Sequence, residues 1–102
     1  MGVDIRWEDE RGRELGCVMD LHNTFSHVLL NQEWTGTKCI GFIDLYGDTI
    51  FNRLQVPVLI LELTAVLDSL SDEESKLHVS QLIQIAEQCS QHVHTYLKFR
   101  GD

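Results

Sequence analysis

Residues 56–70 have the sequence VPVLILELTAVLDSL and show the strongest helical periodicity in the chain. Apolar side chains recur in it at the three- and four-residue spacing of a helix: Val56, Leu59, Ile60, Leu63, Val66, Leu67 and Leu70. Pro57 falls in the first turn, where its missing N–H group is not needed. The stretch therefore predicts a helix whose wide apolar face has to be buried against other elements.

The residues that follow predict a second helix. Ser71, with Glu74 three residues later, has the pattern of a capping box, in which both side chains bond free N–H groups at a helix start. An inward apolar stripe then continues through Val79, Leu82, Ile83, Ala86 and Val93. Because the connection is very short, we expect the two helices to form an antiparallel αα-hairpin.

Several stretches outside the hairpin predict strands. Val3, Ile5 and Trp7 alternate with charged residues, as does the segment 95–99, and such alternation is typical of half-buried strands. Residues 39–45 are apolar on both alternating faces, which predicts a central strand. A turn at residues 46–48 would pair it with a short strand at residues 49–51.

The remaining segments complete the predicted order. Residues 8–14 carry interleaved opposite charges and predict a solvated turn. A short helix with Asp20 or Asn23 as its cap is indicated by the spacing of Leu21, Phe25, Val28 and Leu29. The order is β-α-β-β-α-α-β. We therefore expect an α+β fold in which an αα-hairpin and one short helix cover a small antiparallel or mixed sheet, as a single compact domain over residues 1–102.

The charge balance narrows the class of partner. Sixteen acidic residues against eight basic ones give a formal net charge of −8. Phosphate contacts dominate nucleic-acid affinity, so direct DNA or RNA binding is disfavoured, and so are anionic membranes. A basic protein partner would suit this charge.

The cysteines indicate the compartment. Cys17, Cys39 and Cys89 are odd in number and include no C-x-x-C pair. They predict reduced thiols and a cytoplasmic protein rather than a disulfide scaffold.

Catalytic and cofactor signatures are missing from the sequence. It contains no G-x-G-x-x-G, no G-x-x-x-x-G-K-S/T, no G-x-S-x-G and no H-E-x-x-H. We therefore predict no cofactor and favour a protein that is not an enzyme.

Two weak constellations support a rival hypothesis. His92 and His94 would point the same way on a strand and could share a metal ion, although a histidine near a helix end is more often structural. Asp44 and Asp48 flank a turn, where they could form an acid pair or a hard-cation site. The simpler interpretation is that Asp48 bonds the turn backbone while Asp44 faces solvent.

A third pattern indicates contacts rather than catalysis. One side of the second long helix is polar but uncharged, through Gln81, Gln84, Gln88 and Gln91. Charges are depleted at the cores of interfaces, so this stripe is a candidate contact surface, although a solvated face is the simpler alternative. Trp34, in a predicted loop, is a second candidate, unless it folds back over the core.

These patterns favour a non-enzymatic, acidic interaction protein. We expect self-association as a dimer and, in addition, binding to a basic protein partner. The alternative is a small metal- or ligand-binding module or enzyme that uses Asp44 and Asp48 or the two histidines. A third hypothesis, a small apolar ligand between hairpin and sheet, follows only from the number of apolar residues.

Overall fold

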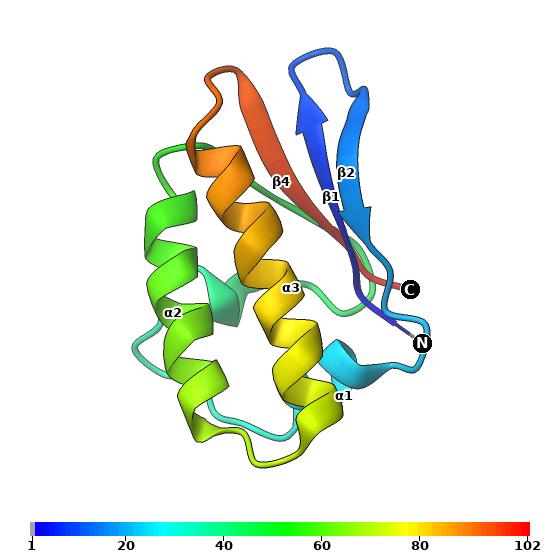
Figure 1. Ribbon diagram of the computed structural model, residues 1–102, viewed down its shortest axis with the longest axis vertical. Coiled ribbons are helices and arrows are strands. Elements are labelled where there is room, and N and C mark those ends of the chain that lie inside the picture. Colours follow the sequence, from blue (N-terminus) through cyan, green and yellow to red (C-terminus); the bar gives the residue numbers. More distant parts are fainter. Residues whose placement is uncertain (1) are drawn as a thin grey trace.

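The computed structural model describes residues 2–102 and has two layers (Figure 1). The elements, in chain order, are β1 (Asp4–Asp9), β2 (Glu14–Val18), α1 (Thr24–Leu30), the 3₁₀ turn η1 (Ile40–Phe42), β3 (Asp48–Phe51), α2 (Val56–Ser69), α3 (Glu73–Ser90) and β4 (Thr95–Arg100). The strands form one antiparallel sheet in the order β2-β1-β4-β3. The α+β fold with a small sheet covered by a helical hairpin and one short helix is therefore confirmed.

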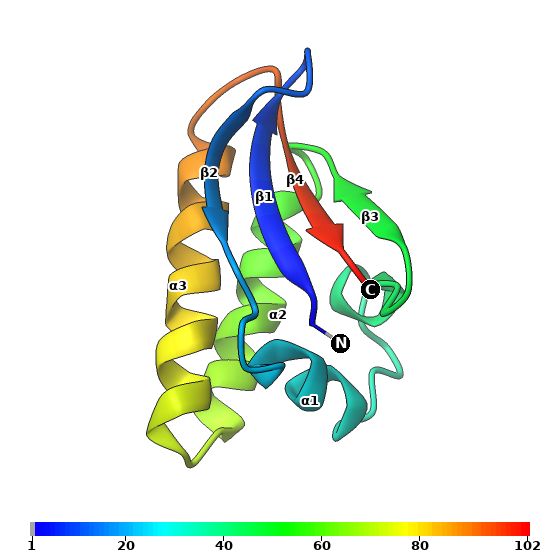
Figure 2. The same cartoon turned by 90° about the vertical axis from the view of Figure 1, so that its right-hand side faces the viewer.

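The helices cover one face of the sheet and leave the other open. Figure 2 shows the four strands in front with α2 and α3 behind them. Along β4, Thr95, Leu97 and Phe99 are buried while Tyr96 and Arg100 are exposed, as the two-residue period of a strand requires. The Phe99 ring lies 5.9 Å from that of Phe25 and 5.8 Å from that of Phe51, so one aromatic cluster joins sheet and α1 in the core.

The predicted αα-hairpin is present, with a different cap. Helix α2 spans Val56–Ser69 and buries Val56, Leu59, Leu63 and Val66 against the core. Helix α3 begins at Glu73, and Asp72 caps it by accepting the N–H of Ser75 at 2.9 Å. The prediction that Ser71 caps this helix is wrong, because the helix starts one residue later and the Asp72 carboxylate binds its free N–H group.

The predicted central strand at residues 39–45 is also wrong. This segment contains the 3₁₀ turn η1, and β3 pairs with β4 instead. The Glu62 carboxylate of α2 accepts three consecutive backbone N–H groups there, from Lys38, Cys39 and Ile40, at 2.6 to 3.0 Å. Those N–H groups are unavailable to a sheet, although Cys39 and Ile40 are buried as their apolar character requires.

One strand was not predicted. The charged segment at residues 8–14 is a solvated turn only between Asp9 and Glu14, since β1 extends to Asp9 and β2 begins at Glu14. The Asp9 carboxylate accepts the N–H groups of Arg13 and Arg11, each at 2.9 Å, and closes the hairpin. These bonds, the one from Arg13 most of all, hold the pKa of Asp9 below its ordinary value.

No helix among residues 2–102 has the length and apolar character to cross a membrane.

Candidate interaction groove

A groove of about 770 Å³ runs between β2 and α3, at one edge of the sheet. We call it the β2–α3 groove. Residues 15–19 and Leu21 form one wall, and the four glutamines predicted as a contact stripe form the other. The structure thus brings Gln81, Gln84, Gln88 and Gln91 together in one concave surface. Figure 2 shows β2 as an outer strand with α3 running alongside it.

The glutamine wall is polar and exposed. Successive steps of three and four residues place its members on one side of α3, with Gln91 at the C-cap. All four side chains are exposed, and none of their amide groups bonds to another residue in the described part of the chain. Each amide therefore keeps both donors and an acceptor for a partner.

The strand wall combines an unpaired backbone edge with exposed apolar side chains. Among residues 2–102, strand β2 pairs only with β1, and its other edge lies at the groove. Leu15 is 46% exposed, Met19 51% and Leu21 78%. This wall could not be found in the sequence, because Glu14-Leu-Gly-Cys-Val18 lacks the alternation of a strand.

The floor of the groove is made by Trp7, Gly16 and Ile85. A β-carbon at Gly16 would lie 3.4 Å from Ile85 Cδ1 and 3.5 Å from the Trp7 ring, so Gly16 faces the helix layer. Trp7 Nε1 is buried and has no hydrogen-bond acceptor among residues 2–102. Alternation along β2 then directs the Cys17 side chain to the open face of the sheet.

The two histidines of the metal hypothesis have separate partners. His92 Nδ1 lies 2.7 Å from the carbonyl oxygen of Gln88, and its ring lies 5.1 Å from that of Trp7. His94 has a left-handed backbone, with φ of 59°, and its Nδ1 lies 3.5 Å from Glu10 Oε2. Within residues 2–102, no three His, Cys, Asp or Glu side chains gather in a way that could hold a metal ion.

The two aspartates of the acid-pair hypothesis are also engaged separately. Asp44 Oδ1 accepts the N–H of Tyr46 at 2.8 Å, so Asp44 rather than Asp48 bonds the turn backbone. The Asp48 carboxylate lies 3.5 Å from Lys98 Nζ and 3.9 Å from Arg100 Nε. Neither Asp44 nor Asp48 lines the β2–α3 groove.

Trp34 lies away from the groove. Its Nε1 donates to the carbonyl oxygen of Leu29 at 2.7 Å, and its half-buried ring packs against the core. It lines a separate pocket of about 220 Å³ next to Glu62. The structure therefore does not bring Trp34 together with the glutamine stripe.

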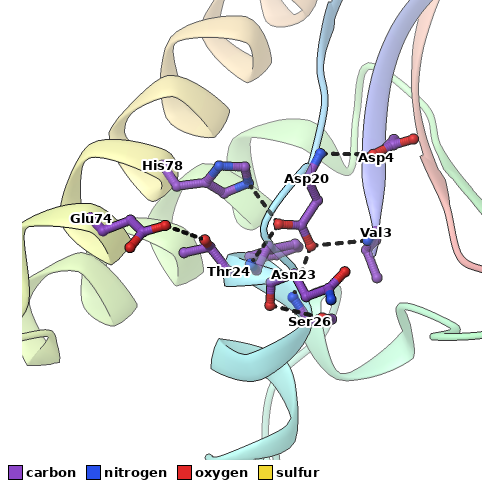
Figure 3. A network of polar contacts seen from close by, with 9 residues as sticks. Val3, Asp4, Asp20, Asn23, Thr24, Ser26, Glu74 and His78 are labelled. Atoms are coloured by element: carbon purple, nitrogen blue, oxygen red, sulfur yellow. Dashed lines mark hydrogen bonds and ion pairs between the residues drawn. The ribbon is translucent and has the colours of Figure 1, made fainter. Parts of the chain in front are cut away.

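A buried polar cluster that the sequence did not single out as a site lies at the start of α1 (Figure 3). Asp20, only 4% exposed, accepts the N–H groups of Val3, Phe25 and Ser26 at 3.0 to 3.1 Å. His78 Nε2 of α3 lies 3.8 Å from Asp20 Oδ1. We call these residues the Asp20 network.

The chemistry of the Asp20 network is that of a structural clamp. Burial lowers the pKa of His78, although the carboxylates of Asp20, Glu74 and Asp4 act against this shift. The Ser26 hydroxyl donates to the carbonyl oxygen of Asn23 at 2.9 Å rather than to the imidazole. Asn23 occupies the N-cap position of α1 but makes no capping side-chain bond. Asp20, the other predicted cap, instead accepts the free N–H groups of Phe25 and Ser26 and ties the helix to the start of the first strand.

The three cysteines are free thiols. Burial raises the pKa of the Cys39 and Cys89 thiols, and both therefore lack the thiolate character of a nucleophile. Cys17 is exposed and belongs to the strand wall of the groove.

Comparison of the chain with known protein families, with curated proteins and with solved structures finds no match.

Proposed function

We propose that this chain is a non-enzymatic interaction protein that self-associates through the β2–α3 groove. The observation that carries the proposal is that the glutamine stripe of α3 and the unpaired edge of β2 line the same groove. A free strand edge offers backbone hydrogen bonds to another chain, and free amides offer side-chain bonds next to them.

The composition of the groove supports a protein contact. Charged residues make up 24% of the chain, yet Glu87 is the only one among the thirteen described residues that line the groove. Interface cores are depleted in charge and keep apolar side chains such as Leu15 and Met19. A solvated face of an acidic protein would carry more charge than this.

The test is to place charge on the glutamine wall. Replacing Gln84→Glu together with Gln88→Glu puts two carboxylates per chain into the contact, where desolvation and mutual repulsion oppose association. We expect native mass spectrometry to give a dimer for the unaltered protein and a monomer for this variant. Circular dichroism should show the same helix content for both.

A matched control carries the same added charge elsewhere. Leu61 and Thr64 are exposed on α2, outside the groove, and Leu61→Glu with Thr64→Glu should leave the dimer intact. An unaltered protein that stays monomeric at high concentration would contradict the proposal. So would a dimer that the groove variant leaves unchanged.

The net charge supports a second role. A chain with a net charge of −8 attracts a basic protein. Because the groove contains a single acidic residue, such a partner would bind elsewhere on the surface. Affinity for such a partner should fall steeply between low and physiological salt. The three free thiols support a reducing compartment such as the cytoplasm for both roles.

A further inference from the structure

The two edges of the sheet differ in how they are protected (Figure 2). At the β3 edge, Asp48 forms ion pairs with the neighbouring strand, and Thr49 Oγ1 accepts the N–H of Asp44 from the adjoining loop at 2.8 Å. At the β2 edge, Glu14 likewise forms an ion pair with Arg6 of the neighbouring strand, at 3.1 Å, and the register with β1 shifts between Trp7 and Glu8, but residues 15–18 of this strand contain no charged residue and no proline. Edge strands in monomers are normally blocked by such residues or covered by a loop. Residues 16–18, which lie beyond the ion pair and the register shift, are therefore the part of this edge that is open for pairing.

The charge of the groove separates two kinds of occupant. A basic partner gains most where acidic side chains gather, and the groove offers it only Glu87. A second copy of this chain carries the same net charge of −8, so charge repulsion opposes its binding except at a surface that is nearly free of charge. The groove is such a surface, so its charge fits a second copy better than a basic protein.

The groove is also complementary to itself. Two identical antiparallel strand edges can exchange backbone hydrogen bonds about a twofold axis, and a symmetric dimer uses one patch on both subunits. Glutamine amides both donate and accept, so two identical stripes can bond to each other. The exposed Leu15 and Met19 side chains supply apolar area at the same place.

From these observations we infer that a second copy docks with its β2 antiparallel to this β2. The two four-stranded sheets then continue as one sheet of eight strands, and the glutamine stripes of the two α3 helices face each other across the twofold axis. This inference rests on the proposed self-association and specifies its geometry.

Cys17 provides a distance probe for this geometry. It lies in β2 and is the exposed cysteine, whereas Cys39 and Cys89 are buried, so a thiol-reactive spin label attaches at Cys17. The label projects from the open face of the sheet, away from the helix layer. With strands about 4.8 Å apart and a rise of about 3.3 Å per residue, pairing centred within residues 15–19 places the two Cys17 Cα atoms within about 15 Å.

An edge substitution tests the same contact without a label. Leu15→Lys places a charge on the β2 edge and should weaken the dimer about tenfold or more, since apolar contact is lost and two ammonium groups meet. Ile50→Lys is the matched control, because Ile50 is 58% exposed on β3, at the other edge of the sheet. This control should leave the dissociation constant of the dimer within about twofold of the original, as expected for a surface change away from a contact.

The outcomes separate this inference from the proposed function. A short Cys17–Cys17 distance, with loss of the dimer in Leu15→Lys alone, supports the inference. Suppose instead that Gln84→Glu with Gln88→Glu dissociates the dimer, but the two labels lie more than about 25 Å apart or Leu15→Lys leaves the dimer intact. This result overturns the inference and leaves the proposed function standing. A protein that is monomeric throughout overturns both.

Discussion

The Asp20 network and the β2–α3 groove are neighbouring polar regions, and both lie against α3. They differ in whether their polar groups have hydrogen-bond partners within the chain. In the network, one buried carboxylate accepts three backbone N–H groups. In the groove, four exposed amides have no partner in the described chain, and a strand edge is unpaired. A saturated polar group holds a fold together, whereas an unsaturated one on a concave surface is free to bind another molecule.

The largest effect expected from this comparison is on the network. Asp20→Ala removes the acceptor of three buried N–H groups and should lower the free energy of unfolding by about 3 kcal/mol or more. Urea denaturation measures this loss. Asp44→Ala, which removes an exposed carboxylate that accepts one N–H, is the control and should cost about 1 kcal/mol. Equal losses for the two variants would show that Asp20 does not clamp the fold.

A smaller effect should appear in the pH dependence of stability. Burial holds the folded pKa of His78 below its ordinary value of 6.5, so below that pH the unfolded chain takes up a proton more readily than the folded one. The stabilising contribution of neutral His78 is therefore complete above pH 6.5 and is lost as the pH falls through the folded pKa.

The measurement compares unaltered protein with His78→Gln across this range. The free energy of unfolding of the variant should fall less between neutral pH and pH 5, because an amide in place of the imidazole cannot take up the proton. Parallel curves for the two proteins would mean that His78 does not titrate differently on folding.

The smallest effect on stability is expected in the groove. Gln84→Ala together with Gln88→Ala removes exposed amides without partners, so the unfolding free energy of the monomer, measured at low concentration, should change by less than about 0.5 kcal/mol. The dissociation constant of the dimer should nevertheless rise. A large loss of monomer stability would place these glutamines in the fold itself and remove the distinction between the two regions.

The parts of the fold that the sequence predicted are those governed by local periodicity. Helices α2 and α3 and strands β1 and β4 are predicted within a few positions of their observed bounds. The predicted stripe of α3 nevertheless included Val93, which lies beyond the helix and is exposed, and missed the buried Ile85 and Cys89. Residues 39–45 have strand-like composition, but Glu62, 22 to 24 residues away in the sequence, binds N–H groups at the start of this segment. A contact of this kind has no signal in the local pattern.

The same limit applies to the candidate site. The glutamine stripe was visible because all four residues belong to one helix and its cap. Its opposing wall was not, because β2 is short, contains Gly16 and is recognisable only through its pairing with β1. The groove needs both walls, and only the helix wall has a pattern in the sequence. The sequence therefore indicated one wall but not the groove itself.

The order of the sheet has a consequence for the way in which this chain folds. The two inner strands, β1 and β4, pair Asp4 with Arg100 and lie at opposite ends of the chain. The β1–β2 turn and the helical hairpin are local and can form early, but the centre of the sheet cannot close until β4 has been synthesised. Until then the apolar faces that β1 and the helical hairpin turn toward β4 stay uncovered, and exposed apolar surface of this kind favours aggregation before the last strand is in place.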